Sequence, residues 1–164
     1  NLNRRNDLKT LIIYASKTGT TEKCAKQINT QLEDSKMVNI LNQDEDINRY
    51  DLIIIGTPIR MGMIDKKIKK LLISNIEALK SKKVAYFICC GFNENWKSYY
   101  EQNIPKDLLD IAIIYDTFGG EIDRQKQKGF DKFIINMVCK NIEKDKGIKI
   151  LNEHIDKFIK VLSK

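Results

Sequence analysis

The sequence contains one run of hydroxyl side chains around a glycine: Ser16, Lys17, Thr18, Gly19, Thr20 and Thr21. This run separates an apolar stretch at 11–15 from a helical pattern that begins near Glu22. The first backbone N–H groups of a helix lack partners inside the helix, and the helix dipole places partial positive charge there. With added hydroxyl donors and a flexible glycine, such a turn can bind a phosphate group. An ordinary capped turn between a strand and a helix is the alternative.

The turn differs from the two best-known phosphate loops. It lacks the Gly-Lys-Ser/Thr ending of nucleoside-triphosphate loops, and it lacks the three glycines of the dinucleotide fingerprint. We therefore expect its ligand to be a monophosphate.

Two later turns also carry residues that suit ligand binding. One follows the apolar run 51–56 and consists of Thr57, Pro58, Ile59, Arg60, Met61 and Gly62. The other lies at the end of the run 84–90 and contains Cys90, Gly91, Phe92, Asn93 and, slightly later, Trp96. Glycines let backbone groups approach a ligand, while methionine and aromatic side chains can cover a planar ring. Simple packing at the rim of the sheet is the alternative for each apolar side chain.

The elements that must position these turns alternate along the chain. Apolar runs predict five strands, at about 9–15, 37–41, 51–56, 84–90 and from 112 onward. Helical patterns begin near 22, run from about 65 to 79, break into two short pieces around Pro105, and return at 129–142 and 151–162. Alternating strands and helices predict an α/β fold, a parallel sheet with helices on both faces. The natural strand order is 2-1-3-4-5, which brings all three turns to the carboxyl edge of the sheet.

The residues in these turns resemble a known family. Ser16 to Thr21 after a first strand resembles the phosphate loop of flavodoxins, which bind FMN through hydroxyls and backbone amides. Ile59-Arg60-Met61-Gly62 resembles the second flavin loop of the flavodoxin-like protoporphyrinogen IX dehydrogenases. The resemblance covers most of the chain and implies the flavodoxin-like fold, FMN as cofactor, and cofactor binding by all three turns. It also implies a link to heme biosynthesis.

Arg60 is the residue on which we expect the flavin chemistry to depend. A cation near the N1–C2 edge of the ring would stabilise the anionic reduced flavin and raise its potential. Exposure of Arg60 to solvent is the alternative. The adjacent Cys89 and Cys90 are expected to be buried and inert, and His154 lies on the polar side of the last helical pattern, where we assign it no chemistry.

Composition limits the possible partners and location. The formal net charge of +7 suggests an acidic partner or an anionic membrane, and no interleaved aromatic-basic pattern supports nucleic-acid binding. Four cysteines without C-x-x-C spacing and a single histidine predict no metal site. No apolar run is long enough to span a bilayer. We expect a cytoplasmic protein with a flexible lead-in at 1–8 and one domain at 9–164.

These residues are compatible with two functions. The resemblance implies an FMN oxidoreductase that oxidises a porphyrinogen and passes electrons to a quinone. The apolar face of the helical pattern at 129–142 would pack in the core, or alternatively contact an anionic membrane peripherally. The segment 93–109 looks shorter than the insert those dehydrogenases carry, which weakens the substrate assignment. The alternative is a small flavodoxin that shuttles electrons between redox partner proteins and has no substrate of its own.

Overall fold

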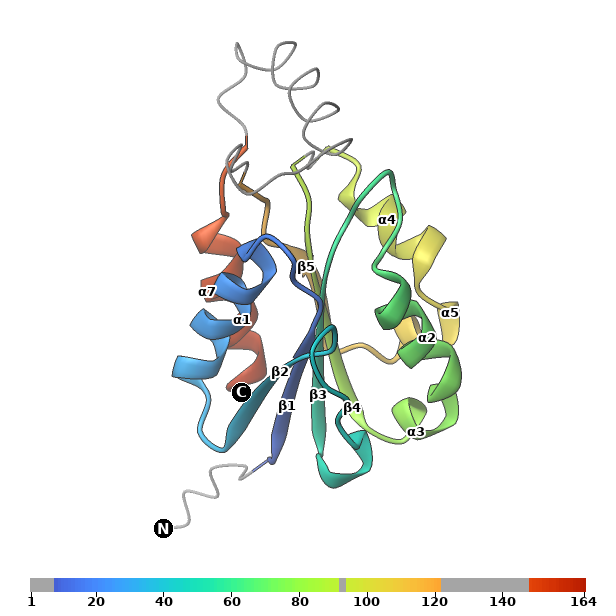
Figure 1. Cartoon of the computed structure of the whole chain (residues 1–164). Coiled ribbons are helices and arrows are strands. Elements are labelled where there is room, and N and C mark those ends of the chain that lie inside the picture. Colours follow the sequence, from blue (N-terminus) through green and yellow to red (C-terminus); the bar gives the residue numbers. More distant parts are fainter. Residues whose placement is uncertain (1–7, 92–93, 122–147) are drawn as a thin grey trace.

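The computed structural model describes residues 8–91, 94–121 and 148–164. Within them, parallel strands form one five-stranded sheet in the order β2-β1-β3-β4-β5, with helices on both faces (Figure 1). The strands are β1 (Thr10–Tyr14), β2 (Ser35–Asn39), β3 (Leu52–Pro58), β4 (Lys83–Cys89) and β5 (Ile114–Thr117). This is the flavodoxin-like α/β fold, and it confirms the strand order predicted from the sequence.

The helices form two outer layers. On one face lie α1 (Thr20–Gln31) and α7 (Asn152–Leu162). On the other face lie α2 (Lys66–Ser74), α3 (Ile76–Lys80), α4 (Trp96–Asn103) and α5 (Lys106–Asp110), and the short 3-10 helix η1 (Ile47–Arg49) precedes β3. The described helices therefore sandwich the sheet in three layers.

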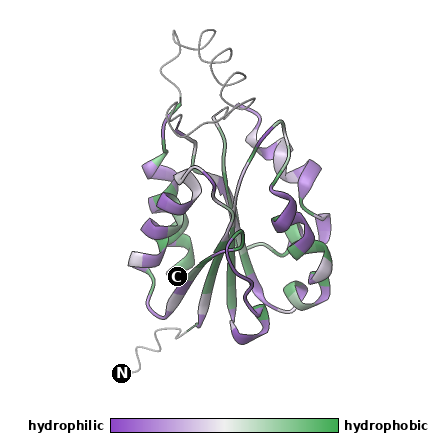
Figure 2. Ribbon diagram, viewed as in Figure 1, coloured by the Kyte–Doolittle hydropathy of each residue, from purple (hydrophilic) through white to green (hydrophobic). Residues whose placement is uncertain are grey.

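Alternation along the strands divides the core into two clusters. In β1, Leu11 and Ile13 pack toward α2–α5, while Ile12 and Tyr14 pack toward α1 and α7. Successive side chains of a strand point to opposite faces, so a strand covered on both faces is apolar throughout. Figure 2 shows this as a hydrophobic sheet between helices with hydrophilic outer sides.

Two elements differ from their predicted bounds. The helix expected at 65–79 is divided at Asn75, whose side-chain amide donates to the Leu71 carbonyl at 2.9 Å and ends α2. Strand β2 begins at Ser35 rather than 37, because Ser35 and Lys36 pair with β1 through their backbones although their side chains are polar. The two short helices around Pro105 and the last helix are confirmed.

Several predictions fall on residues that the structure does not describe. The helical pattern at 129–142 lies outside the described residues, as do Phe92, Asn93 and most of the lead-in. Among the helices of the described ranges, none has the length and apolar character needed to cross a membrane.

Candidate ligand site at the carboxyl edge of the sheet

The hydroxyl-rich turn joins the end of β1 to the start of α1. Gly19 precedes the helix with a φ of 97°, a left-handed conformation that favours glycine. Its N–H donates to the Ser16 Oγ at 3.1 Å, which closes the turn. Asn39, the last residue of β2, holds Ser16 from the side by accepting its N–H at 3.4 Å and donating to its carbonyl at 3.0 Å. The backbone at the start of α1 is therefore fixed by local contacts and by the neighbouring strand.

The hydroxyls of this turn are unequally exposed. Thr20 and Thr21 are buried, Ser16 and Thr18 are half-buried, and Lys17 is exposed. Thr20 Oγ1 donates to the Glu121 carboxylate at 3.3 Å, and the Lys23 ammonium lies 2.7 Å from the same oxygen. A carboxylate of the chain itself thus lies at the N-terminus of α1, where partial positive charge favours an anion. Glu121 is 101 residues from Thr20, and no sequence motif identified it.

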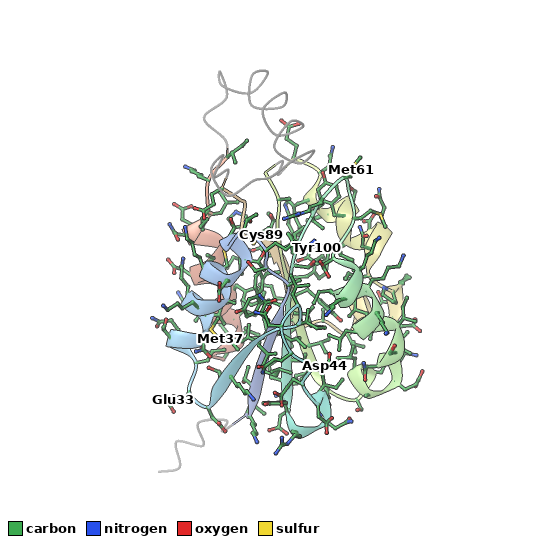
Figure 3. The ribbon with its side chains drawn as sticks, in the orientation of Figure 1. Glu33, Met37, Asp44, Met61, Cys89 and Tyr100 are labelled. Carbon is green, nitrogen blue, oxygen red and sulfur yellow. The ribbon has the colours of Figure 1, made fainter. Side chains whose placement is uncertain are left out.

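The second turn is a tight hairpin after β3. Arg60 and Met63 exchange two backbone hydrogen bonds, each 3.0 Å long. The two residues between them have positive φ angles, 52° at Met61 and 77° at Gly62. This is the pattern of a type I′ turn, which suits glycine and strains a side chain such as that of Met61. Met61 is 86% exposed at the tip of the loop, and Figure 3 labels it there.

Two buried polar side chains hold the hairpin in place. Asn103 donates to the Gly62 carbonyl at 2.8 Å and accepts the Ile64 N–H at 3.2 Å. The Thr57 hydroxyl accepts the Asp65 N–H at 3.0 Å and donates to the Pro58 carbonyl at 3.1 Å. Thr57 and Pro58, predicted in the turn, are the last residues of β3, and Ile59 N–H continues the pairing to the Cys89 carbonyl. The sequence did not single out Asn103, because its partners lie far away along the chain.

The third turn is described only at its two ends. Cys90 is buried, and its N–H donates to the Gly119 carbonyl at 2.8 Å. Trp96 begins α4 and packs edge-on against Tyr100 and Tyr115, with ring centroids 5.9 and 6.3 Å apart. Trp96 therefore covers the β5 side of the sheet, while Cys90 and Gly91 follow β4 at the carboxyl edge.

The buried ionisable groups near this edge favour their neutral forms. The Cys89 Sγ lies 3.9 Å from the Cys24 Sγ, and this hydrogen bond together with burial raises the pKa of the Cys89 thiol. Burial and the neighbouring Glu22 carboxylate raise the pKa of Tyr14 to about 12. A buried, protonated thiol is a poor nucleophile, in agreement with the expectation that Cys89 is inert.

His154 has a partner that the sequence did not reveal. Its Nδ1 lies 2.8 Å from the buried carboxylate of Asp116, on β5. Because 38 residues separate the two side chains, the pair could be recognised only in the folded structure. No cluster of three or more potential metal ligands occurs in the parts of the chain that the structure describes.

Comparison with known proteins shows to which family this chain belongs. Residues 11–148 match the sequence profile of the flavodoxin domain. The chain is 31% identical over 108 residues to the flavodoxin-like domain-containing protein BilS of Clostridioides difficile (strain CD3). That match covers 63% of this chain and 58% of the relative, so the chain spans less than two thirds of the relative's length.

Solved structures share the fold. A flavoprotein from Lactobacillus acidophilus NCFM, crystallised in complex with FMN, is 25% identical with a TM-score of 0.51, over 67% of this chain and 93% of that one. The two-electron reduced flavodoxin of Megasphaera elsdenii is 23% identical with a TM-score of 0.51, over 66% of this chain and 84% of that one. The profile match spans most of the chain and all three turns at the carboxyl edge, and the chain belongs to the flavodoxin family.

Proposed function

We propose that this chain binds FMN at the carboxyl edge of the sheet and acts as an FMN-dependent oxidoreductase. The observation that carries the proposal is the meeting of three turns, after the adjacent strands β1, β3 and β4, at one edge. The first of these turns begins a helix whose N-terminus already lies against a carboxylate. FMN would supply a ring that accepts and releases electrons, and the protein would bind and tune it.

The phosphate of FMN would bind at the start of α1. Backbone N–H groups there have no partner within the helix, and Ser16, Thr18 and Thr20 would add hydroxyl donors. The contacts of Asn39 with Ser16 keep this turn in place before any ligand arrives. A preorganised turn binds a phosphate without first having to be ordered.

The ring would lie against the hairpin 60–63. A methyl group added at Gly62 would meet only Tyr99, at 4.0 Å, among the described residues, so that side of the hairpin has room for a ligand. Asn103 and Thr57 hold the hairpin backbone from beneath. Backbone groups in this position can hydrogen-bond a ring edge, and Met61 can cover its face.

Binding is tested by titrating the flavin-free protein with FMN and with riboflavin, which lacks the phosphate. We expect FMN to bind about 100-fold more tightly, because several charge-assisted hydrogen bonds are lost with riboflavin. Thr20→Val should weaken FMN binding about tenfold through the loss of one such bond. Thr30→Val, an exposed position in the last turn of the same helix, is the matched control. Equal affinities for FMN and riboflavin would contradict the proposal.

The substrate that we propose is a porphyrinogen, with a quinone as electron acceptor. The support is the resemblance of Ile59-Arg60-Met61-Gly62 to the flavin loop of protoporphyrinogen IX dehydrogenases. The net charge of +7 suits anionic substrates and a peripheral position at an anionic membrane, where quinones are found. We place the protein in the cytoplasm or at the inner face of the membrane.

An electron carrier between proteins is the second candidate. It is favoured by the exposure of Met61 and Met63, 86% and 50%, at the rim of the proposed ring site. Exposed methionines provide an adaptable apolar surface that a redox partner can contact. In this case the protein would have no small-molecule substrate.

One anaerobic experiment separates the two candidates. The FMN-loaded protein is mixed with protoporphyrinogen, and the flavin absorbance and porphyrin fluorescence are followed. Bleaching of the flavin with appearance of the porphyrin, reversed by a soluble quinone, supports the dehydrogenase. Unchanged absorbance, together with rapid reoxidation of the chemically reduced protein by cytochrome c but not by quinone, supports the carrier.

A further inference from the structure

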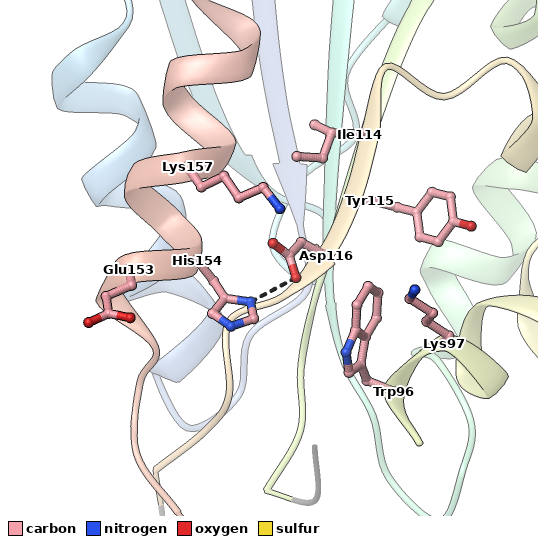
Figure 4. Close-up of a pocket in the computed structure, with 8 residues that line it drawn as sticks. All are labelled: Trp96, Lys97, Ile114, Tyr115, Asp116, Glu153, His154 and Lys157. Atoms are coloured by element: carbon pink, nitrogen blue, oxygen red, sulfur yellow. Dashed lines mark hydrogen bonds and ion pairs between the residues drawn. The ribbon is translucent and has the colours of Figure 1, made fainter. Parts of the chain in front are cut away.

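A cleft of about 490 Å³ lies beside β5, at the edge of the sheet. Its walls come from the start of α4, from β5 and from the first turns of α7 (Figure 4). The volume lies within the range of small-molecule sites in proteins. Of its lining residues only Trp96 belongs to the set predicted for FMN, so the cleft needs a separate explanation.

The cleft contains a histidine oriented by a buried carboxylate. The Asp116 side chain is 8% exposed, and its Oδ1 accepts both the Thr117 N–H at 2.7 Å and the Nδ1 of His154 at 2.8 Å. An ionised carboxylate at Nδ1 keeps the proton on that nitrogen and fixes the plane of the ring. The other ring nitrogen then lies on the side away from Asp116, as Figure 4 shows.

Two lysines line the cleft together with this histidine. Lys157 follows His154 by three residues on α7 and extends toward Asp116 (Figure 4). Glu153 also lines the cleft, with its carboxylate on the far side of His154 from Asp116. On the opposite wall, the Lys97 ammonium lies 5.6 Å from the centroid of the Trp96 ring. The Asp116 carboxylate is engaged by His154 and Thr117. The ammonium groups of Lys97 and Lys157 therefore remain for an anionic ligand.

Aromatic rings form the apolar part of the same cleft. Trp96 and Tyr115 pack edge to face with their centroids 6.3 Å apart, and Ile114 continues this surface along β5. Aromatic faces and edges bind flat conjugated molecules well. The cleft thus joins an aromatic wall to a group of cations.

We propose that this cleft binds a small aromatic carboxylate. Lys157 and His154 would hold the carboxylate, and the Trp96–Tyr115 wall would hold the ring. The Lys157 ammonium is a suitable donor to a carboxylate, and His154, whose Nδ1–H is held by Asp116, donates from Nε2–H as the imidazolium. The aromatic wall removes the hydrocarbon body of the ligand from water. Trp96 is the one residue that this site shares with the residues predicted for FMN, and the other cleft residues do not depend on FMN being bound.

The chain offers a direct probe of this cleft, because Trp96 is its only tryptophan. In ¹⁵N-labelled protein, its indole N–H gives a single resonance. We expect 1-naphthoate to shift this resonance saturably in the protein as isolated and again with saturating FMN. The neutral 1-naphthamide and the ringless acetate should each bind about tenfold more weakly, since each lacks one of the two interactions.

Variants on α7 identify the cationic contacts. Lys157→Gln and His154→Gln should each weaken 1-naphthoate binding about threefold to tenfold, through the loss of a partly exposed charged contact. Lys160→Gln, exposed on the same helix, should leave it unchanged. Far-ultraviolet circular dichroism checks that each variant is folded.

Three results would overturn the proposal. The first is an indole resonance that does not move when 1-naphthoate is added, and the second is 1-naphthamide that binds as tightly as 1-naphthoate. The third is an equal affinity for 1-naphthoate in the Lys157, His154 and Lys160 variants. Failure of FMN to bind would leave this titration interpretable, because it is also done on the protein as isolated.

Discussion

The carboxylate of Glu121 lies 3.3 Å from the hydroxyl of Thr20, the first residue of α1. The same oxygen lies 2.7 Å from the Lys23 ammonium, so the chain places its own anion at the N-terminus of this helix. A phosphate bound there would have to displace Glu121 or lie close to it, and like charges at short range repel.

Removing this charge should therefore strengthen FMN binding. We expect Glu121→Gln to lower the dissociation constant of FMN about threefold to tenfold, since both groups are partly exposed to solvent. Riboflavin, which has no phosphate, should bind equally to both proteins. Glu33→Gln, beyond the opposite end of α1, is the control, and fluorescence quenching of FMN is the measurement. Weaker FMN binding by Glu121→Gln would mean that the carboxylate supports the site rather than competing for it.

Met61 makes a second prediction possible, because it has a φ of 52° and is 86% exposed. Asparagine tolerates the left-handed conformation better than methionine does. Met61→Asn should therefore raise the free energy of unfolding of the flavin-free protein by about 0.5–1 kcal/mol. The same change should weaken FMN binding if Met61 covers the ring.

The matched control is Met63→Asn, in the same hairpin but outside the positive-φ residues. Urea denaturation should show no stabilisation by this change. A Met61 variant that is less stable than the parent would contradict the assignment of strain to this position.

The fold could be predicted from the sequence because its signals are local. The strands β1, β3 and β4 are apolar over their length, and the alternation with helices limits the strand order. The hydroxyls at 16–21 and the break at Pro105 are likewise visible within a few residues. The start of strand β2 is harder to predict, because at the sheet edge its polar residues Ser35 and Lys36 pair only through the backbone.

The contacts that position the site could not be predicted, because they join distant residues. Asn103 reaches Gly62 across 41 positions, and Glu121 reaches Thr20 across 101. A lone asparagine or glutamate in the sequence carries no sign of such a partner. The Asp116–His154 pair cannot be recognised from the sequence for the same reason, although His154 is the single histidine of the chain.

The buried hydroxyl of Tyr86 leads to a prediction about the stability of the core. Its hydroxyl is buried and makes no hydrogen bond to any described residue, and burial raises the pKa of this phenol above its usual value. An unpaired buried hydroxyl costs free energy, so Tyr86→Phe should stabilise the protein by about 1 kcal/mol. Tyr100→Phe is the contrasting variant, because its hydroxyl donates to the Asp116 carbonyl at 2.6 Å. It should destabilise by about 1 kcal/mol, and destabilisation by both changes would indicate a partner for Tyr86.

Glu45 makes stability depend on pH. The hydrogen bond from Lys36, 2.8 Å long, lowers the pKa of this carboxyl below its ordinary value, with a further contribution from the Tyr50 hydroxyl. A carboxyl with a lower pKa in the folded protein contributes stability above its unfolded pKa, and this stability is lost as the pH falls through the folded value. The difference in stability between the parent protein and Glu45→Gln should therefore be present at pH 7 and shrink in acid. A difference that stays constant with pH would exclude this linkage.

Arg60 gives the sharpest test of how the chain would tune a flavin. Its backbone is fixed by the two hydrogen bonds to Met63, so its side chain starts from a defined place at the proposed ring site. A cation there stabilises the reduced, anionic ring more than the oxidised one. Arg60→Gln should then lower the two-electron midpoint potential of bound FMN by about 20–30 mV, which corresponds to about 1 kcal/mol.

Two control variants separate the effect of the Arg60 charge on the midpoint potential from a structural effect. Arg60→Lys keeps the charge and should retain most of the potential, whereas Arg49→Gln, in η1 before β3, removes an equal charge at the opposite end of that strand. Equal shifts in the Arg60 and Arg49 variants would reflect only the net charge of the protein. An unchanged midpoint in Arg60→Gln would remove Arg60 from the flavin chemistry and leave the hairpin as a purely structural contact. A shift confined to Arg60→Gln would favour substrate oxidation over low-potential electron carriage, since the higher potential makes the flavin the better oxidant.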